Sequence, residues 1–301
     1  MKITRRNVLK GIATVGAVGA AVAVAGDAEA REGFKPAADD VGMLFDSTLC
    51  VGCRACQTAC KVRNNLATDS RQVQGGVYDA PLDLNGNTKN VIKLAQDGQA
   101  TTYMKMQCMH CVDPACVSVC MAGALHKVAG GITAYNAATC VGCRYCQIGC
   151  PFNVPKYEWS KSLPIAEDPK IVKCELCRHD QRGPACCEVC PRGAVIYGKR
   201  SDLLAEARRR VAASPGKYFQ DRVYGEADGG GTSVLYLSPK EVSFGALGLP
   251  ALPGEPLPAL SENVQHGTYT LGIAPIALYT ALTVVQLRSR RRDEQAKKEG
   301  H

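Results

Sequence analysis

The sequence has few of the residues that most catalytic sites use. Its 301 residues include only five histidines, which are scattered, and aromatic residues make up 6%. A Rieske centre needs two histidine ligands, and their pattern is missing. The Gly-x-Gly-x-x-Gly fingerprint of a nucleotide site and the Cys-x3-Cys-x2-Cys triplet of radical enzymes are also missing. The sequence therefore gives no indication of a bond-making active site.

Charge of one sign is not in large excess in the body of the chain. The formal net charge is +8, and most of it belongs to residues 1–30 and 288–301. The net charge of the residues between these two ends is ordinary for a soluble domain, so it does not indicate a nucleic-acid partner. That part of the chain is long enough for one or two small domains.

Cysteine, by contrast, is abundant, with seventeen residues. The run from Cys140 to Cys150 has the spacing Cys-x2-Cys-x2-Cys-x3-Cys and is followed by Pro151. This pattern holds iron–sulfur clusters through thiolates, and in two-cluster ferredoxins its fourth cysteine ligates the other cluster. The run from Cys50 to Cys60 has the same spacing and similar neighbours, which indicates a duplicated module.

Two further groups bring the number of candidate ligands to sixteen. The second group widens one gap and comprises Cys108, Cys111, Cys116 and Cys120. The fourth contains an insertion and comprises Cys174, Cys177, Cys190 and one of the adjacent Cys186 and Cys187, so one cysteine is left over. We assign Cys186 as the ligand because its three-residue gap to Cys190 matches the other groups, and Cys187 remains the alternative. Four such groups predict four 4Fe–4S clusters if thiolates are exchanged in pairs.

Zinc sites and disulfides are the structural alternatives for these cysteines. Zinc sites commonly join two Cys-x2-Cys knuckles across a longer loop. Three of the four groups instead place all four cysteines within about a dozen residues, which suits a cube better than a tetrahedral ion. Either alternative describes a redox-inert scaffold, and the metal content of the protein separates it from an electron carrier.

Residues 1–30 have the features of an export signal. Thr4–Lys10 resembles the twin-arginine motif, an apolar run from Gly11 to Ala25 follows, and Ala28–Glu29–Ala30 matches a cleavage site. The mature chain would then begin at Arg31, although an uncleaved signal or a membrane anchor is an alternative. The twin-arginine route carries folded proteins, which fits cysteines that receive their clusters in the reducing cytoplasm.

The C-terminal region predicts a membrane anchor. Residues 268–288 contain nineteen successive residues without a charge, from Tyr269 to Leu287, and arginines follow at once. This length and flank predict one transmembrane helix with the basic tail, residues 289–301, in the cytoplasm. A buried core helix is the alternative. The bulk of the protein would then lie on the periplasmic side of the inner membrane.

Between the ends, local patterns predict several elements. They comprise a surface excursion over 63–99 with a strand at 91–94, a hairpin around 130–135, a helix over 201–213 capped by Ser201, a strand at 232–237 and an extended linker over 245–260.

Several motifs resemble a known family. They are Met43–Cys53, Gln107–Pro114, Asn153–Tyr157 and Ser261–His266, together with the four cysteine groups. The chain resembles the four-cluster ferredoxin subunits of membrane-bound bacterial oxidoreductases, and most closely the iron–sulfur subunit of the type-2 nickel–iron hydrogenase of enterobacteria. Met121 departs from the proline usual there, so the surroundings of one cluster differ.

The resemblance implies an α+β fold with two ferredoxin-like bi-cluster domains and one C-terminal transmembrane helix. The first domain would comprise residues 31–99 and 160–200, the second residues 100–159, and residues 201–260 would form an extension and linker. The four implied ligand sets are Cys50, Cys53, Cys56 and Cys190; Cys60, Cys174, Cys177 and Cys186; Cys108, Cys111, Cys116 and Cys150; and Cys120, Cys140, Cys143 and Cys146.

The resemblance also implies partners. The chain would be a non-catalytic subunit that carries electrons between the small and large subunits of a periplasmic hydrogenase and an integral membrane subunit that reacts with quinone. The alternative is the same electron path in a molybdenum-containing formate dehydrogenase or reductase complex.

Overall fold

The computed structural model describes residues 33–67, 81–158, 170–258 and 279–289. Residues 33–258 belong to one compact unit. The export signal predicted at 1–30 and the tail predicted from 290 onward lie outside the described residues, as does the first half of the predicted membrane helix. Residues 279–289 are helical. Among the described residues, no helix is both long and apolar enough to cross a membrane.

A three-stranded sheet forms the centre of the compact unit. Strand β1 (Val41–Asp46) pairs antiparallel with β8 (Val195–Lys199) and parallel with β9 (Val234–Leu237), in the order β8-β1-β9. All four residues of β9 are buried, as expected of a continuous apolar run covered on both faces. A Cβ on Gly42 would lie 2.0 Å from the carbonyl oxygen of Ser233, so β1 needs glycine where it approaches β9.

Three antiparallel hairpins complete the strands. Strand β2 (Val91–Asp97) pairs with β3 (Ala100–Met106), β4 (Leu125–Val128) with β5 (Ile132–Tyr135), and β6 (Lys156–Glu158) with β7 (Lys170–Val172). The strand predicted at 91–94 and the hairpin predicted around 130–135 are confirmed. The domain boundary predicted between residues 99 and 100 falls in the turn between the paired strands β2 and β3, and the division into two domains stays a prediction.

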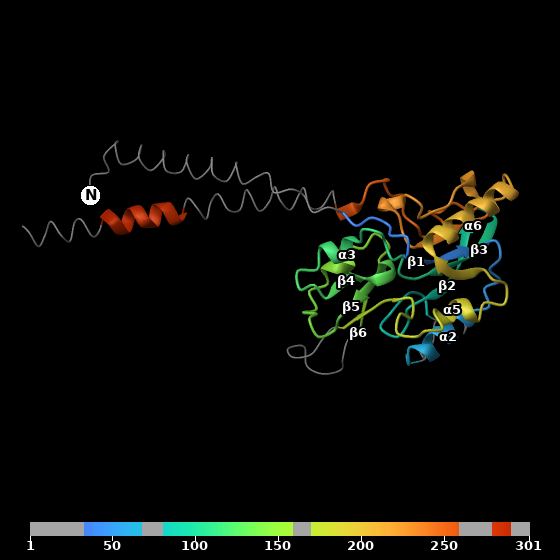
Figure 1. The fold of residues 1–301 in the computed structure, drawn as a ribbon, viewed down its shortest axis with the longest axis horizontal. Helices are drawn as coiled ribbons and strands as arrows, with labels where there is room; N and C mark the ends of the chain where they lie inside the picture. Colours follow the sequence, from blue (N-terminus) through green and yellow to red (C-terminus); the bar gives the residue numbers. More distant parts are fainter. Residues whose placement is uncertain (1–32, 68–80, 159–169, 259–278, 290–301) are drawn as a thin grey trace, which may run out of the picture. The chain divides into compact units, whose positions relative to one another are not determined.

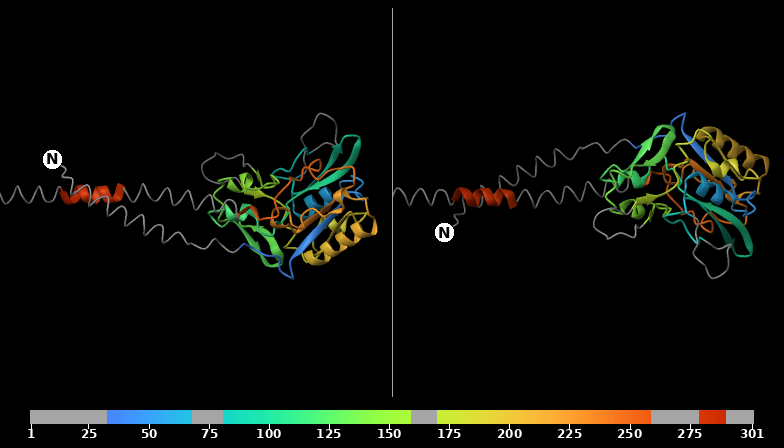
Figure 2. Two further views of the ribbon diagram at one scale, coloured as in Figure 1. Left: turned by 90° about the horizontal axis from the view of Figure 1, so that it is seen from above. Right: turned by 90° about the horizontal axis from the view of Figure 1, so that it is seen from below.

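The short helices bring the cysteine groups together in pairs. Helix α2 (Ala55–Arg63) lies against α5 (Ala185–Glu188), and α3 (Ala115–Ser118) lies against α4 (Tyr145–Ile148). Figure 1 shows α3, β4, β5 and β6 on one side of the unit and α2 with α5 on another, and Figure 2 gives two further views. The first cysteine group therefore meets the fourth, and the second meets the third.

Helix α6 (Arg200–Ala213) covers one face of the central sheet. Its Leu203 and Ala207 are buried in a cluster with Leu44 of β1 and Leu235 of β9. The helix predicted at 201–213 is confirmed, but Ser201 does not cap it. The helix begins one residue earlier because the backbone N–H of Arg200 donates to the Asp40 carbonyl, while the buried Arg200 side chain donates to the Thr232 carbonyl.

The region after the sheet is more ordered than the sequence predicts. Before β9, the described residues form 3-10 turns at η2 (Ala129–Gly131), inside the β4–β5 hairpin, and at η3 (Phe219–Asp221) and η4 (Asp228–Gly230). The extended linker predicted over 245–260 is wrong in its first part, because Leu247 and Leu249 are buried in the main core. Phe244, just before them, packs edge-on against Phe219 with ring centroids 5.5 Å apart. Apolar contact rather than local propensity fixes this segment.

Candidate iron–sulfur sites

Four cysteines line a cavity between α2 and the start of β8, which we call site A. They are Cys50, Cys53, Cys56 and Cys190, and the cavity opens to solvent. Three of these residues come from the first cysteine group and one from the last. The chain reaches this arrangement because β1 and β8 pair side by side, which places the loops that follow β1 and precede β8 at one edge of the sheet.

The loop of site A and the matching loop of the third cysteine group have the same backbone conformation. Gly52 and Arg54 have φ values of +68° and +60°, and the matching Gly142 and Arg144 have values of +69° and +66°. Residues with a left-handed backbone conformation turn the chain sharply, so successive cysteine side chains converge on one side of the loop. A Cβ on Gly52 would lie 2.4 Å from the ring of Tyr103, so glycine is also required there by space.

A second cavity, site B, is lined by the other cysteines of the same pair of groups. They are Cys60, Cys174, Cys177 and Cys186. The backbone N–H of Leu176 donates to the sulfur of Cys174 at 3.4 Å. Cys187 is absent from the lining of site B, whereas its neighbour Cys186 is part of it.

Cys186 and Cys187 also differ in pKa. A hydrogen bond from the thiol of Cys187 lowers the pKa of Cys186, against the opposing effect of burial. The same bond, with burial, raises the pKa of Cys187. This interaction favours ionisation of Cys186 over that of Cys187.

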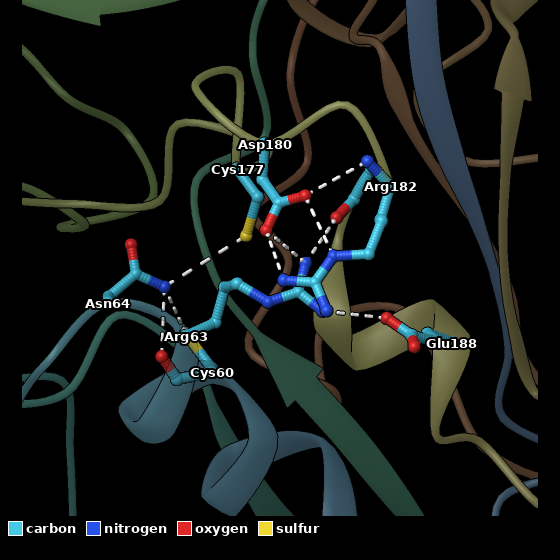
Figure 3. A network of polar contacts seen from close by, with 8 residues as sticks. Cys60, Arg63, Asn64, Cys177, Asp180, Arg182 and Glu188 are labelled. Atoms are coloured by element: carbon cyan, nitrogen blue, oxygen red, sulfur yellow. Dashed lines mark hydrogen bonds and ion pairs between the residues drawn. The ribbon is translucent and has the colours of Figure 1, made fainter.

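The rim of site B is held by a polar network shown in Figure 3. Asn64 donates to the Cys60 carbonyl at 2.9 Å, and its Nδ2 lies 3.6 Å from the sulfur of Cys60 and 3.9 Å from that of Cys177. Arg63 pairs with Asp180 at 2.9 Å and with Glu188 at 2.7 Å, which ties the end of α2 to the 180–188 segment. These contacts join the first and fourth cysteine groups through side chains.

The remaining candidate ligands form two more groups. Site C comprises Cys108, Cys111, Cys116 and Cys150, and site D comprises Cys120, Cys140, Cys143 and Cys146. Burial raises the pKa of Cys111, and the nearby Cys150 and Cys108 raise it further. In site D, burial raises the pKa of Cys146 and so do Cys120, Cys140 and Cys143, while a hydrogen bond with Tyr157 lowers it. The backbone N–H of Leu125 donates to the sulfur of Cys120 at 3.5 Å.

Electrostatic interactions connect neighbouring sites. Cys56 of site A interacts with Cys186 of site B, and Cys150 of site C interacts with Cys146 of site D. The buried Tyr236 interacts with Cys174 of site B and with Cys108 of site C. Sites A and D each contain one exposed cysteine, Cys53 and Cys143, whereas sites B and C contain none.

Comparison with known proteins identifies the group to which this arrangement belongs. Residues 99–200 match the 4Fe-4S dicluster domain. The chain is 38% identical to the Hydrogenase-2 operon protein HybA of Escherichia coli O157:H7 and of Shigella flexneri, over 97% of this chain and 97% of theirs. The chain belongs to the HybA family. It is also 35% identical to the nitrate-inducible formate dehydrogenase iron-sulfur subunit of Escherichia coli (strain K12), over 66% of this chain and 68% of that one.

The donor set of this HybA-family chain fits iron–sulfur clusters, which cysteine thiolates hold. Each of the seventeen is a described residue and a free thiol. Within the described parts of the chain, no three His, Cys, Asp or Glu side chains converge at the distances of one metal ion. Burial raises the pKa of Cys56 to about 12, although Lys105 opposes it, and that of Cys150 to about 11. Such thiols ionise when a cationic cofactor replaces their protons. Ligation by the sixteen cysteines remains a prediction.

Several polar residues at the sites carry no sequence signal. Lys105 and Lys173 are buried beside the cysteines, and nothing in their local sequence separates them from exposed lysines. His110 is a spacer in the Cys-Met-His-Cys loop: it is buried, and its Nδ1 accepts the backbone N–H of Thr133 at 3.1 Å. Burial, with Lys173 and Lys127 nearby, lowers the pKa of His110, so its ring is neutral. Only the folded arrangement reveals these environments.

Proposed function

We propose that this chain carries electrons through four 4Fe–4S clusters bound at sites A to D. The observation that supports the proposal is the grouping of sixteen cysteines into four sets: those of sites A and B line two cavities, and those of sites C and D interact within each set. Cys53 of site A and Cys143 of site D are exposed. Membership of the HybA family and the match to the dicluster domain support it. In this proposal the chain itself is an electron-transfer subunit rather than an enzyme.

In this proposal, bound clusters would exchange one electron at a time. The residues of the chain hold the clusters, exclude water and donate hydrogen bonds to the sulfurs. The cysteine thiolates hold the cofactors, with Cys190 and Cys60 exchanged between sites A and B, and Cys150 and Cys120 between sites C and D. Buried side chains such as Tyr236 exclude water between the sites. Backbone N–H groups, as at Leu176 and Leu125, donate to ligand sulfurs and favour the reduced form.

The proposed partners are the small and large subunits of a nickel–iron hydrogenase and an integral membrane subunit that reacts with quinone. The relative that matches 97% of the chain is a hydrogenase-2 operon protein, which supports this choice. A second candidate is the same role beside a formate dehydrogenase, because the 35% identical relative is an iron-sulfur subunit of that enzyme. The second similarity covers only 66% of the chain, which favours the hydrogenase.

The proposed location is the periplasmic side of the inner membrane. Residues 1–30 would direct export by the twin-arginine route, and residues 268–288 would form a single C-terminal anchor with a cytoplasmic tail. The twin-arginine pattern and the uncharged C-terminal run support this location.

The finer fold proposal is two bi-cluster modules. The first contains sites A and B with α2 and α5, and the second contains sites C and D with α3 and α4.

The test is anaerobic purification of the chain from membranes, with iron and sulfide determined per chain. We expect about sixteen irons and several interacting signals in electron paramagnetic resonance after reduction. Hydrogenase subunits that co-purify would support the first candidate, and a formate dehydrogenase subunit the second. Zinc or oxidised cysteines in place of iron would refute electron transfer.

A further inference from the structure

Lys105 is a fully buried lysine in the wall between sites A and B. It lies on β3 and has no exposed surface. Its side chain lines the cavity of site A. Its Nζ donates to Oε1 of Gln107, and Gln107 lines the cavity of site B together with Met43. The Lys105–Gln107 pair therefore reaches from one cavity to the other.

The surroundings fix the position of this cation. Gln107 directs its Nε2 toward the sulfur of Met43, 3.1 Å away, so its Oε1 faces Lys105. The hydroxyl of the buried Tyr236 donates to the backbone carbonyl of Lys105 at 2.5 Å. The ammonium is therefore held by a neutral amide within a packed strand and has little freedom to move.

Cysteine side chains of both sites surround Lys105. Cys56 shares the lining of site A with it, and Cys186 of site B, Cys56 and Cys174 are the groups whose ionised forms would most stabilise its charge. A buried ammonium is costly unless an anion compensates it. Thiolate-bound clusters on both sides would supply that compensation, and they become more negative when they are reduced.

We propose that Lys105 is a fixed positive charge shared by sites A and B that raises the reduction potentials of the clusters at both. The proposal deepens the proposed function and rests on it. The physical reason is that a cation stabilises the reduced, more negative form of each site more than the oxidised form, and burial keeps solvent from screening the effect. One side chain thereby acts on two neighbouring sites without binding iron.

Neutralisation of this residue tests the proposal. The full chain with Lys105→Met, purified with its natural partners, is compared with the native protein in a redox titration followed by electron paramagnetic resonance. At a fixed potential we expect the ratio of reduced to oxidised cluster to fall at least tenfold at two sites, equivalent to 59 mV for one electron. Lys105→Arg should restore most of the shift, since it retains the charge.

The matched control is Lys93→Met on the neighbouring strand β2. The side chain of Lys93 is 38% exposed and pairs with Asp83, so its loss should leave every potential unchanged. Gln107→Glu provides a second variant in case Lys105→Met does not load iron: a carboxylate beside the ammonium should lower the same two potentials.

The outcomes separate this inference from the proposed function. If Lys105→Met has its full iron content and unshifted potentials, the role of Lys105 is overturned and the electron path is left intact. If Lys105→Met does not bind iron, the same result in Gln107→Glu has the same meaning. An equal shift in Lys93→Met would also overturn it, because the effect would not depend on position. A native chain without clusters would overturn the proposed function itself, and this inference with it.

Discussion

Cys186 and Cys187 are adjacent in sequence, yet only Cys186 lines site B. We expect Cys186→Ser to lose about four irons per chain, since one cluster would lack a ligand. Cys187→Ser should retain full iron, because Cys187 does not line site B and a serine hydroxyl can still donate to Cys186. Iron analysis of the two purified variants measures both, and iron loss in Cys187→Ser alone would reverse the assignment.

Asn64 is a second single residue with a measurable effect. Its amide lies beside the sulfurs of Cys60 and Cys177, and Lys89 donates to its Oδ1 at 2.8 Å, which fixes the amide orientation. We expect Asn64→Leu to shift the reduced-to-oxidised ratio of the site B cluster about fivefold toward the oxidised form, because such a bond contributes about 1 kcal/mol. A potentiometric titration measures the shift, and Gln99→Leu, which alters an exposed amide, is the control.

At the scale of elements, Arg63 connects the end of α2 to the segment around α5. Its side chain is 15% exposed, donates to the Gly183 carbonyl at 3.2 Å and pairs with Asp180 and Glu188. We expect Arg63→Met to release iron from site B roughly threefold faster on warming, since partly exposed ion pairs each contribute less than about 1 kcal/mol.

The control for Arg63 is Arg182→Met. Arg182 is 66% exposed and pairs with Asp180 within its own loop, so it does not connect the two groups. Bleaching of the cluster absorbance measures the rates. Equal rates in the two variants would mean that the link between α2 and the 180–188 segment does not protect site B.

The elements were predicted from sequence to different degrees. The strand at 91–94, the hairpin at 130–135 and the helix at 201–213 have strong local signals, and the structure contains all three. Residues 245–249 have a loop-like composition, yet Leu247 and Leu249 enter the core because distant apolar surfaces cover them. Likewise, cysteine spacing indicates candidate ligands, whereas the burial of Lys105 depends on how β3 meets both cavities.

At the scale of the whole molecule, residues 33–258 form one compact unit separate from the ends. We expect a chain that stops at Pro258 to leave the membrane fraction while retaining its iron, because the predicted anchor lies beyond that point. Fractionation of carbonate-washed membranes, with iron analysis of the released protein, measures both. Membrane retention of the truncated chain would contradict the single-anchor prediction.

Site B joins segments that are far apart in the chain, as the Arg63–Glu188 contact spans 125 residues. During synthesis, Cys60 emerges from the ribosome long before Cys186. A nascent chain therefore cannot complete site B until most of its folded unit has been made. Site A has the same requirement through Cys190, whereas sites C and D need only the central stretch of the chain. Assembly of the electron path would accordingly begin in the middle of the sequence and finish at sites A and B.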